Sequence, residues 1–245
     1  MTDTAGTTLD TLLGGRVRHS QARDGHRTGI EPALLAAFVP ARPGERVLEG
    51  GTGAGAALLC LAARVALAGG VGVEINPDQV ALARANVAAN GWIHLEILQA
   101  DLETADFAEK FDHAMANPPW HVPGGTLSPD PAKALARHAS PHLATIWATA
   151  LARPLRHRGT LSFITGAGTL AYTLAAFTQA GLGSHTVLPL WPRAGRAAKL
   201  VLVQGVKGGR GPSRLLPGLV LHAGGGGYTE AAEAVLRDGK DLSRG

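Results

Sequence analysis

Asn117, Pro118, Pro119 and Trp120 form a tetrapeptide whose residue types few structural requirements would bring together. Two consecutive prolines fix φ near about −65° and donate no backbone hydrogen bond, so a strand that runs into them must end. The residue before a proline is disfavoured in the α region, which leaves Asn117 extended at the strand end. An amide oxygen, proline carbonyls and an aromatic face would then share the carboxyl edge of a strand. This combination suits a planar group that carries an amine.

A second candidate site lies upstream, in the glycine-rich segment from Glu49 to Gly55. The segment joins a predicted strand to a predicted helix, where glycines let a ligand approach backbone N–H groups and the helix N-terminus. Its spacing also satisfies the dinucleotide-binding pattern, with Glu74 near the position of that pattern's ribose-binding acid. This loop alone therefore leaves open a nicotinamide-dependent enzyme.

Three features favour a different cofactor. Glu49 places a carboxylate just before the glycines, where it would repel a pyrophosphate and suit a ligand ammonium group. Asp101 adds an acid at the end of the third predicted strand, within reach of an adenine amine. The fourth predicted strand ends in the Asn117 tetrapeptide, which is not typical of hydride transfer.

Strands and helices alternate along most of the chain, which predicts a doubly wound, mostly parallel α/β sheet of about seven strands. The last two strands are close in sequence, so we expect an antiparallel edge hairpin. The predicted strands span 46–49, 71–75, 93–100, 111–116, 160–165, 184–190 and 199–206, with a further short strand at 219–222. The predicted helices span 31–38, 56–67, 78–90, 131–139, 143–155, 170–180 and 229–237. We expect a single domain overall, with residues 1–43 as an N-terminal cap and 44–245 as the catalytic domain with a basic C-terminal extension.

Composition and charge limit the possible partners. With 45% hydrophobic and 17% charged residues, the 245-residue chain is typical of a folded protein. A single cysteine excludes a disulfide framework, and the absence of a signal or spanning segment favours a cytoplasmic protein without a membrane partner.

Residues 1–130 hold 9 Lys/Arg and 15 Asp/Glu, whereas residues 131–245 hold 14 Lys/Arg and 4 Asp/Glu. The positive C-terminal half suggests a polyanionic partner. The histidines predict no metal site, because Pro141 separates His138 from His142.

Taken together, these motifs resemble the class I S-adenosylmethionine-dependent methyltransferases over roughly residues 44–206. The segment 21–35 and the tail from Leu219 to Thr229 are similar to those of bacterial tRNA adenine-N6 methyltransferases, which modify the adenine beside the anticodon of a valine tRNA. The resemblance implies S-adenosylmethionine as cofactor and adenine N6 in tRNA as the acceptor. It departs from the usual pattern at Glu49, where Asp is common, and at Trp120, where Tyr or Phe is common.

The resemblance also implies roles for individual residues. Asn117 and Pro118 would accept hydrogen bonds from the target amine, with Pro119 completing the motif and Trp120 stacked on the base. Glu74 would hold the ribose hydroxyls and Asp101 the adenine amine. The full set implied at the cofactor is Glu49, Gly51, Thr52, Gly53, Gly55, Glu74, Ile75, Asp101 and Asn117.

The tetrapeptide does not by itself name the acceptor. Similar motifs serve protein glutamine N5 and ribosomal RNA guanine N2 methyltransferases, which remain alternatives, and a more distant one is an NAD-binding or non-catalytic nucleotide-binding protein. The positive C-terminal half favours tRNA or another RNA, with Arg193, Arg196 and Lys199 as candidate phosphate contacts. A monomer or weak dimer is expected.

Overall fold

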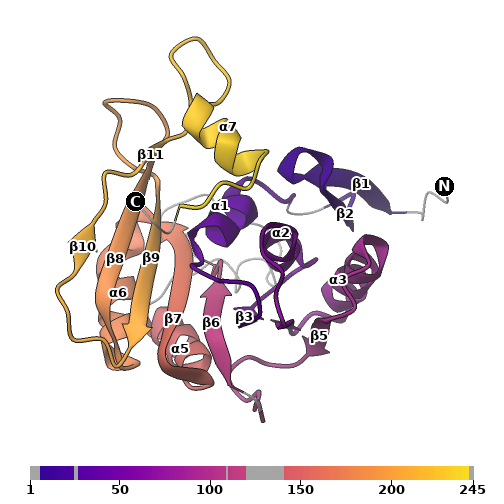
Figure 1. Ribbon diagram of the computed structural model, residues 1–245, viewed down its shortest axis with the longest axis horizontal. Coiled ribbons are helices and arrows are strands. Elements are labelled where there is room, and N and C mark those ends of the chain that lie inside the picture. Colours follow the sequence, from indigo (N-terminus) through magenta and orange to yellow (C-terminus); the bar gives the residue numbers. More distant parts are fainter. Residues whose placement is uncertain (1–5, 25–26, 109, 120–140, 243–245) are drawn as a thin grey trace.

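The computed structural model describes residues 6–24, 27–108, 110–119 and 141–242. Its main sheet is built from β3 (Arg46–Gly50), β4 (Gly69–Glu74), β5 (Leu95–Gln99), β6 (Phe111–Ala116), β7 (Leu155–Gly166), β8 (Leu182–Trp191), β9 (Leu200–Lys207), β10 (Arg214–Leu215) and β11 (Leu219–Val220). The strand order is β10-β8-β9-β7-β6-β3-β4-β5, with β11 beside β8 (Figure 1). β9 runs antiparallel to both β7 and β8, and the other pairs are parallel. The predicted mixed, mostly parallel sheet is confirmed.

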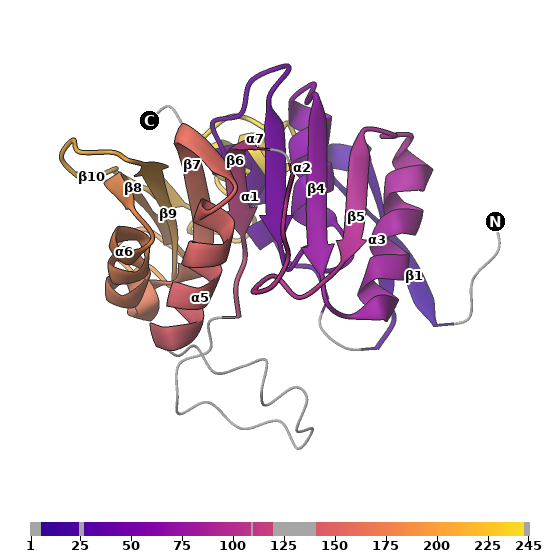
Figure 2. The same cartoon turned by 90° about the horizontal axis from the view of Figure 1, so that it is seen from below.

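Helices cover both faces of this sheet (Figure 2). They are α1 (Glu31–Phe38), α2 (Ala56–Arg64), α3 (Pro77–Asn90), α5 (Pro141–Ala152), α6 (Leu170–Gln179) and α7 (Glu230–Leu236). The buried side chains of α1, α2, α3 and α7 join one hydrophobic cluster. Those of α5 and α6, including Leu151 and Phe177, join a second. None of the helices in the described ranges combines the length and apolar character needed to cross a membrane.

Several predicted boundaries were wrong, and α2 shows why. The apolar run predicted a helix to residue 67, but α2 ends at Arg64 and Val65 is extended. The Gly44 N–H donates to the Ala66 carbonyl at 2.9 Å, so these residues pair with the chain entering β3 instead of continuing the helix. β4 begins at Gly69, earlier than predicted, because its two glycines pair with Arg46 and Val47 of β3. The sheet has nine strands instead of about seven, because β10 was not predicted and the short strand predicted at 219–222 joins the sheet as β11. The predicted helix 131–139 lies outside the described residues.

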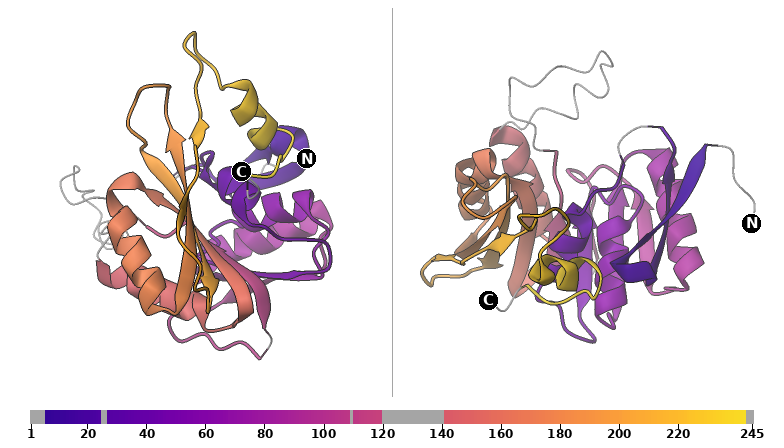
Figure 3. Two further views of the ribbon diagram at one scale, coloured as in Figure 1. Left: turned by 60° about the vertical axis from the view of Figure 1, so that its left-hand side comes forward. Right: turned by 90° about the horizontal axis from the view of Figure 1, so that it is seen from above.

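An N-terminal hairpin packs beside α3 (Figure 3). It consists of β1 (Thr7–Leu12) and β2 (Val17–Ala22), joined by a 3-10 turn at Leu13–Gly15. Asn86 of α3 accepts from the Ser20 N–H at 2.7 Å and donates to the Ser20 carbonyl at 2.8 Å. Asn90 does the same for Arg18, at 2.9 and 2.7 Å. Two side-chain amides thus take the place of a neighbouring strand along the outer edge of β2.

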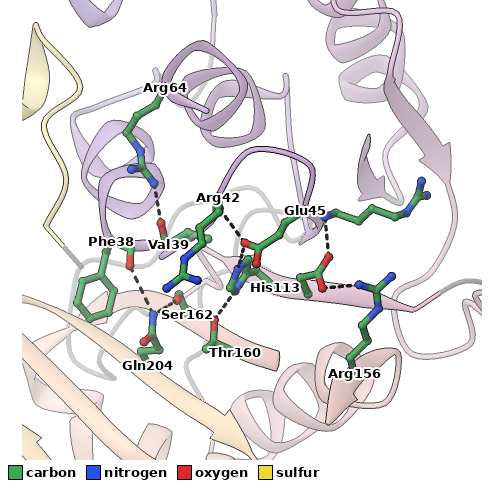
Figure 4. A network of polar contacts seen from close by, with 12 residues as sticks. Phe38, Val39, Arg42, Glu45, Arg64, His113, Arg156, Thr160, Ser162 and Gln204 are labelled. Atoms are coloured by element: carbon green, nitrogen blue, oxygen red, sulfur yellow. Dashed lines mark hydrogen bonds and ion pairs between the residues drawn. The ribbon is translucent and has the colours of Figure 1, made fainter. Parts of the chain in front are cut away.

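A polar network joins the amino ends of β3, β6 and β7 (Figure 4). The buried His113 ring donates from Nε2 to Glu45 at 2.9 Å, and its Nδ1 lies 2.8 Å from the Thr160 hydroxyl. The same Glu45 carboxylate accepts from the Arg42 N–H at 2.7 Å. The order of groups resembles a nucleophile, base and acid, but the Thr160 residue is only 8% exposed. The network therefore ties three strands together at the edge opposite Asn117.

Candidate active site

The structure brings those predicted site residues that it describes to one edge of the sheet. Parallel strands end at the same edge, and the register places Gly50 of β3 opposite Ala116 of β6. On the other side, Glu74 ends β4 opposite Gln99 of β5. The glycine loop, Glu74, Asp101 and Asn117 therefore follow the ends of four neighbouring strands.

Glu49 lies beneath the glycine loop and holds its shape. Its residue is 3% exposed. One carboxylate oxygen, Oε2, accepts from the Thr52 hydroxyl at 2.5 Å and from the Leu58 N–H at 3.1 Å. These contacts tie the end of β3 to the loop and to the first turns of α2. Contact between Glu49 and a ligand ammonium group stays a prediction.

Burial changes the acidity of this carboxyl group. Loss of solvation raises the pKa of Glu49 from 4.5 to about 8, although the hydrogen bonds from Thr52 and Leu58 lower it and the nearby Glu74 raises it further. At neutral pH the ligand-free group is therefore mostly protonated. A cation bound nearby would favour its ionised form, so Glu49 can respond to a ligand's positive charge.

Glu74 connects the ends of two strands. Its Oε2 accepts from the Gly53 N–H at 2.9 Å, and Oε1 accepts from the N–H groups of Ile75 and Asn76, each at 2.9 Å. A carboxylate offers about four acceptor positions, so these bonds leave about one for a hydroxyl. Ile75 is 63% exposed beside it, which gives this edge an apolar surface next to an acid.

Asp101 is exposed two residues after β5, where it caps a turn. Its Oδ1 accepts from the Glu103 N–H at 2.9 Å, and its carbonyl accepts from the Ala105 N–H at 2.8 Å. The turn fixes the start of this side chain at the site edge. Its predicted contact with an adenine amine stays a prediction.

Asn117 directly follows β6, as the sequence predicted. The residue is half-buried, Pro118 is buried and Pro119 is half-buried. Since Ala116 pairs with Gly50, Asn117 lies beside the first residues of the glycine loop. Trp120, the fourth residue of the motif, lies outside the described residues.

The predicted RNA-contacting residues occupy the loop between β8 and β9. Arg193, Arg196 and Lys199 are all exposed. Leu200, the first residue of β9, pairs with Gly166 at the carboxyl end of β7, so this loop lies at the same edge of the sheet as Asn117. Figures 1 and 3 show it near the loop between β11 and α7.

An aromatic pair lies next to this basic loop. The rings of His222 and Tyr228 stack with centroids 4.9 Å apart and an interplanar angle of 21°. The His222 N–H donates to the Pro192 carbonyl at 3.1 Å, which joins the two loops. The half-buried rings therefore lie beside the loop that carries the exposed cations.

The role of Asn86 could not be predicted from the sequence. The residue is 1% exposed, and its side chain, besides holding Ser20, donates to the Ala54 carbonyl within the glycine loop at 2.9 Å. A polar residue in a helix is usually read as solvent-facing, so only the tertiary structure identifies this link between hairpin and loop.

Comparison with known proteins agrees with this geometry. Residues 28–146 match the family described as the methyltransferase small domain. A Tolumonas auensis protein named tRNA1(Val) (adenine(37)-N6)-methyltransferase is 31% identical over 185 residues, covering 75% of this chain and 77% of that protein. A relative of the same name from Aeromonas salmonicida is 30% identical over 207 residues, covering 83% of this chain and 86% of the relative.

A solved structure extends the likeness to the whole fold. A predicted O-methyltransferase from Agrobacterium tumefaciens, protein Atu636, has a TM-score of 0.68 and 25% sequence identity, and the match covers 86% of this chain and 97% of that one. The sequence match to the curated relatives spans most of both chains. The chain therefore belongs to the family of tRNA1(Val) (adenine(37)-N6)-methyltransferases.

Proposed function

We propose that this protein transfers the methyl group of S-adenosylmethionine to the exocyclic N6 of an adenine in tRNA, next to the anticodon of a valine tRNA. The relatives' names support the acceptor. The observation that carries the proposal is the pairing of Gly50 with Ala116, which sets the glycine loop beside Asn117. A donor held by the loop and an amine held at Asn117 would thus be neighbours.

The proposed cofactor fits the groups at this edge. S-adenosylmethionine supplies an activated methyl on a sulfonium, a ribose diol and an adenine. Glu74 keeps about one acceptor position for a ribose hydroxyl, and the exposed Ile75 offers an apolar surface to the adenine. The side of Gly53 where a Cβ would point is open, with its nearest atom, Gln79 Oε1, 3.9 Å away. Backbone can approach a ligand closely there.

The chemistry proposed is an in-line displacement. The lone pair of adenine N6 forms the new N–C bond as the C–S bond breaks, S-adenosylhomocysteine leaves, and the extra N6 proton passes to solvent. That lone pair is normally delocalised into the ring. Hydrogen bonds from the amine to the Asn117 side chain and the Pro118 carbonyl would favour a pyramidal nitrogen aimed at the methyl. Positioning of this kind lowers a barrier without a specially tuned base.

The proposed RNA surface is the exposed edge formed by Arg193, Arg196 and Lys199. Phosphate contacts position a nucleic acid without reading its sequence. The stacked His222 and Tyr228 rings beside these cations suit unpaired bases, which stack on aromatic side chains. A target adenine must leave its own stack to react, so a loop of tRNA is a better acceptor than a duplex.

The proposal is tested by incubating the enzyme and labelled S-adenosylmethionine with a cell extract of a source organism lacking the enzyme. The tRNA, ribosomal RNA and protein are then separated, and the labelled nucleosides and amino acids of each fraction are identified. We expect the label in N6-methyladenosine of valine tRNA. Label in guanosine would indicate the ribosomal RNA guanine alternative, and label in protein glutamine would indicate the protein alternative. Calorimetric binding of NAD in place of S-adenosylmethionine would refute a methyltransferase function.

A further inference from the structure

The indole of Trp147 lies against the glycine loop. A Cβ atom at Gly51 would clash with Cη2 of Trp147, and Cζ3 of the same ring would lie 3.0 Å away. The next turn of α5 repeats the contact, because a Cβ atom at Gly50 would lie 3.1 Å from the Leu151 side chain. The glycine at position 51 therefore makes room for an aromatic ring, whereas the one at position 53 faces open space.

The position of the Trp147 ring at the sheet edge places it near both parts of the candidate site. α5 packs against β3, β6 and β7, and its Trp147 lies against Gly51, directly after the residue of β3 that pairs with Ala116. In the proposed reaction, the methionine part of the donor runs along the glycine loop while its methyl points to the amine at Asn117. The sulfonium must then lie between these two points, near Trp147, whose residue is half-buried.

An aromatic ring has the right chemistry for such a position. A sulfonium is a cation, and indole is the side chain that attracts cations best through its π face. A carboxylate could also attract it but would bring lone pairs that compete for the methyl group. Glu49, the acid at the end of β3, is directed beneath the loop to Thr52 and Leu58.

Resting on the function proposed above, we infer that Trp147 is a positioning residue that holds the sulfonium end of S-adenosylmethionine by cation–π attraction. The same ring discriminates between donor and product, because S-adenosylhomocysteine has an uncharged thioether at that place. Trp147 thereby favours exchange of spent product for fresh donor.

The test compares two ligands on each variant. Calorimetry gives the dissociation constants of S-adenosylmethionine and S-adenosylhomocysteine for the wild type, Trp147→Leu and Trp147→Phe. We expect Trp147→Leu to weaken donor binding about tenfold and product binding less than about threefold. Trp147→Phe keeps a weaker π face and should give an intermediate ratio. Because the ratio is measured within one protein, a general loss of folding cancels.

Trp92→Leu is the matched control, since it removes another half-buried indole that packs against the opposite hydrophobic cluster. Its donor-to-product ratio should equal that of the wild type. Equal losses for both ligands in Trp147→Leu, or no loss, would overturn the inference while leaving the proposed function intact. A wild type that binds neither ligand would overturn both.

Discussion

Asn117 is held at its place by a strand end and by the proline that follows, so its substitution should act on the reaction rather than on the fold. We expect Asn117→Ala to lower the rate of methyl transfer by at least about 100-fold, because a hydrogen bond to the reacting group is lost in the transition state. Donor affinity measured by calorimetry should change little. Single-turnover transfer of labelled methyl to tRNA gives the rate.

Asn117→Asp is the informative companion variant. It keeps an oxygen that can accept from the amine, so it should retain more activity than Asn117→Ala. If the alanine variant transferred methyl groups at the wild-type rate, the role assigned to Asn117 would be wrong.

The buried Glu49 predicts a dependence of stability on pH. Its pKa rises from 4.5 to about 8 on folding, so between these values the folded chain binds more protons than the unfolded chain. Stability contributed by this residue therefore falls as pH rises from about 5 to 8. Glu49→Gln cannot ionise and should be more stable than the wild type by about 2–4 kcal/mol at pH 8, at about 1.4 kcal/mol per pKa unit. Urea unfolding at pH 5 and pH 8 measures the difference.

At pH 5 the two proteins should be nearly equally stable, which serves as the internal control. If the difference in the free energy of unfolding between Glu49→Gln and the wild type were the same at pH 5 and at pH 8, Glu49 would not titrate as its burial indicates. With donor bound, an ammonium group near Glu49 should draw out its proton. Calorimetry at pH 7 in two buffers of different ionisation enthalpy would detect that release, and it should be absent in Glu49→Gln.

The conformation of the glycine loop depends on two elements that are distant from it in sequence, the β1–β2 hairpin and α3. The hairpin is held on α3 by Asn86 and Asn90, and Asn86 alone also reaches the Ala54 carbonyl of the loop. Asn86 and Asn90 offer a matched comparison, because both bind the backbone of β2 while only Asn86 also contacts the glycine loop.

Asn86→Ala should weaken donor binding several-fold and lower the free energy of unfolding by about 1–3 kcal/mol, since it leaves buried backbone groups without partners. Asn90→Ala should release the hairpin at Arg18 and leave donor affinity close to that of the wild type. Limited proteolysis reports hairpin release, and calorimetry reports donor binding. Equal donor affinities in the two variants would show that the contact with Ala54 has no effect on the loop.

The elements that position the site were predictable where their ends are set by local chemistry. β6 spans the predicted residues because prolines follow Asn117, and α3 begins after Asn76, whose side chain caps it, and ends before Gly91 in the left-handed conformation. The end of α2 was not predictable, because the Ala66 carbonyl pairs with the distant Gly44. Local sequence carries turn and cap signals but not such pairings.

The position of the candidate site, like the ends of these elements, was predictable only where local sequence determines it. Residues at the ends of parallel strands could be grouped from sequence, since those ends share one edge of a sheet. The direction in which each side chain points could not be predicted from the sequence. Glu49 is directed under the loop, and Trp147 reaches Gly51 from a helix almost a hundred residues away, contacts that depend on how α2 and α5 pack on the sheet.

Across the whole molecule, charge is divided along the chain. Residues 131–229 contain 11 Lys or Arg and no Asp or Glu. This part forms β7, β8 and β9 and the loops at the sheet's far end, so a polyanion would meet little repulsion there. The cations at the carboxyl edge lie on the same side as Asn117, and others lie at the amino edge. RNA bound with its target base at Asn117 should contact only the cations at the carboxyl edge.

Two double variants with the same change in charge test this arrangement. Arg193→Ala with Arg196→Ala removes two cations at the carboxyl edge, and Arg158→Ala with Arg210→Ala removes two exposed cations near the amino ends of β7 and β8. We expect the first pair to weaken tRNA binding about tenfold at low salt and to lower the slope of log affinity against log salt by about 1–2, because each phosphate contact releases counterions. Filter binding at several salt concentrations measures both quantities.

The second pair should leave the salt slope near its wild-type value. Neither pair should change donor affinity, because none of the four arginines is among the residues proposed to hold the donor. Equal effects of the two pairs would mean that RNA is held by overall charge rather than by the loop between β8 and β9. A larger effect of the amino-edge pair would place the RNA on the opposite side of the sheet, where its bases could not reach Asn117, and would contradict the proposed mode of binding.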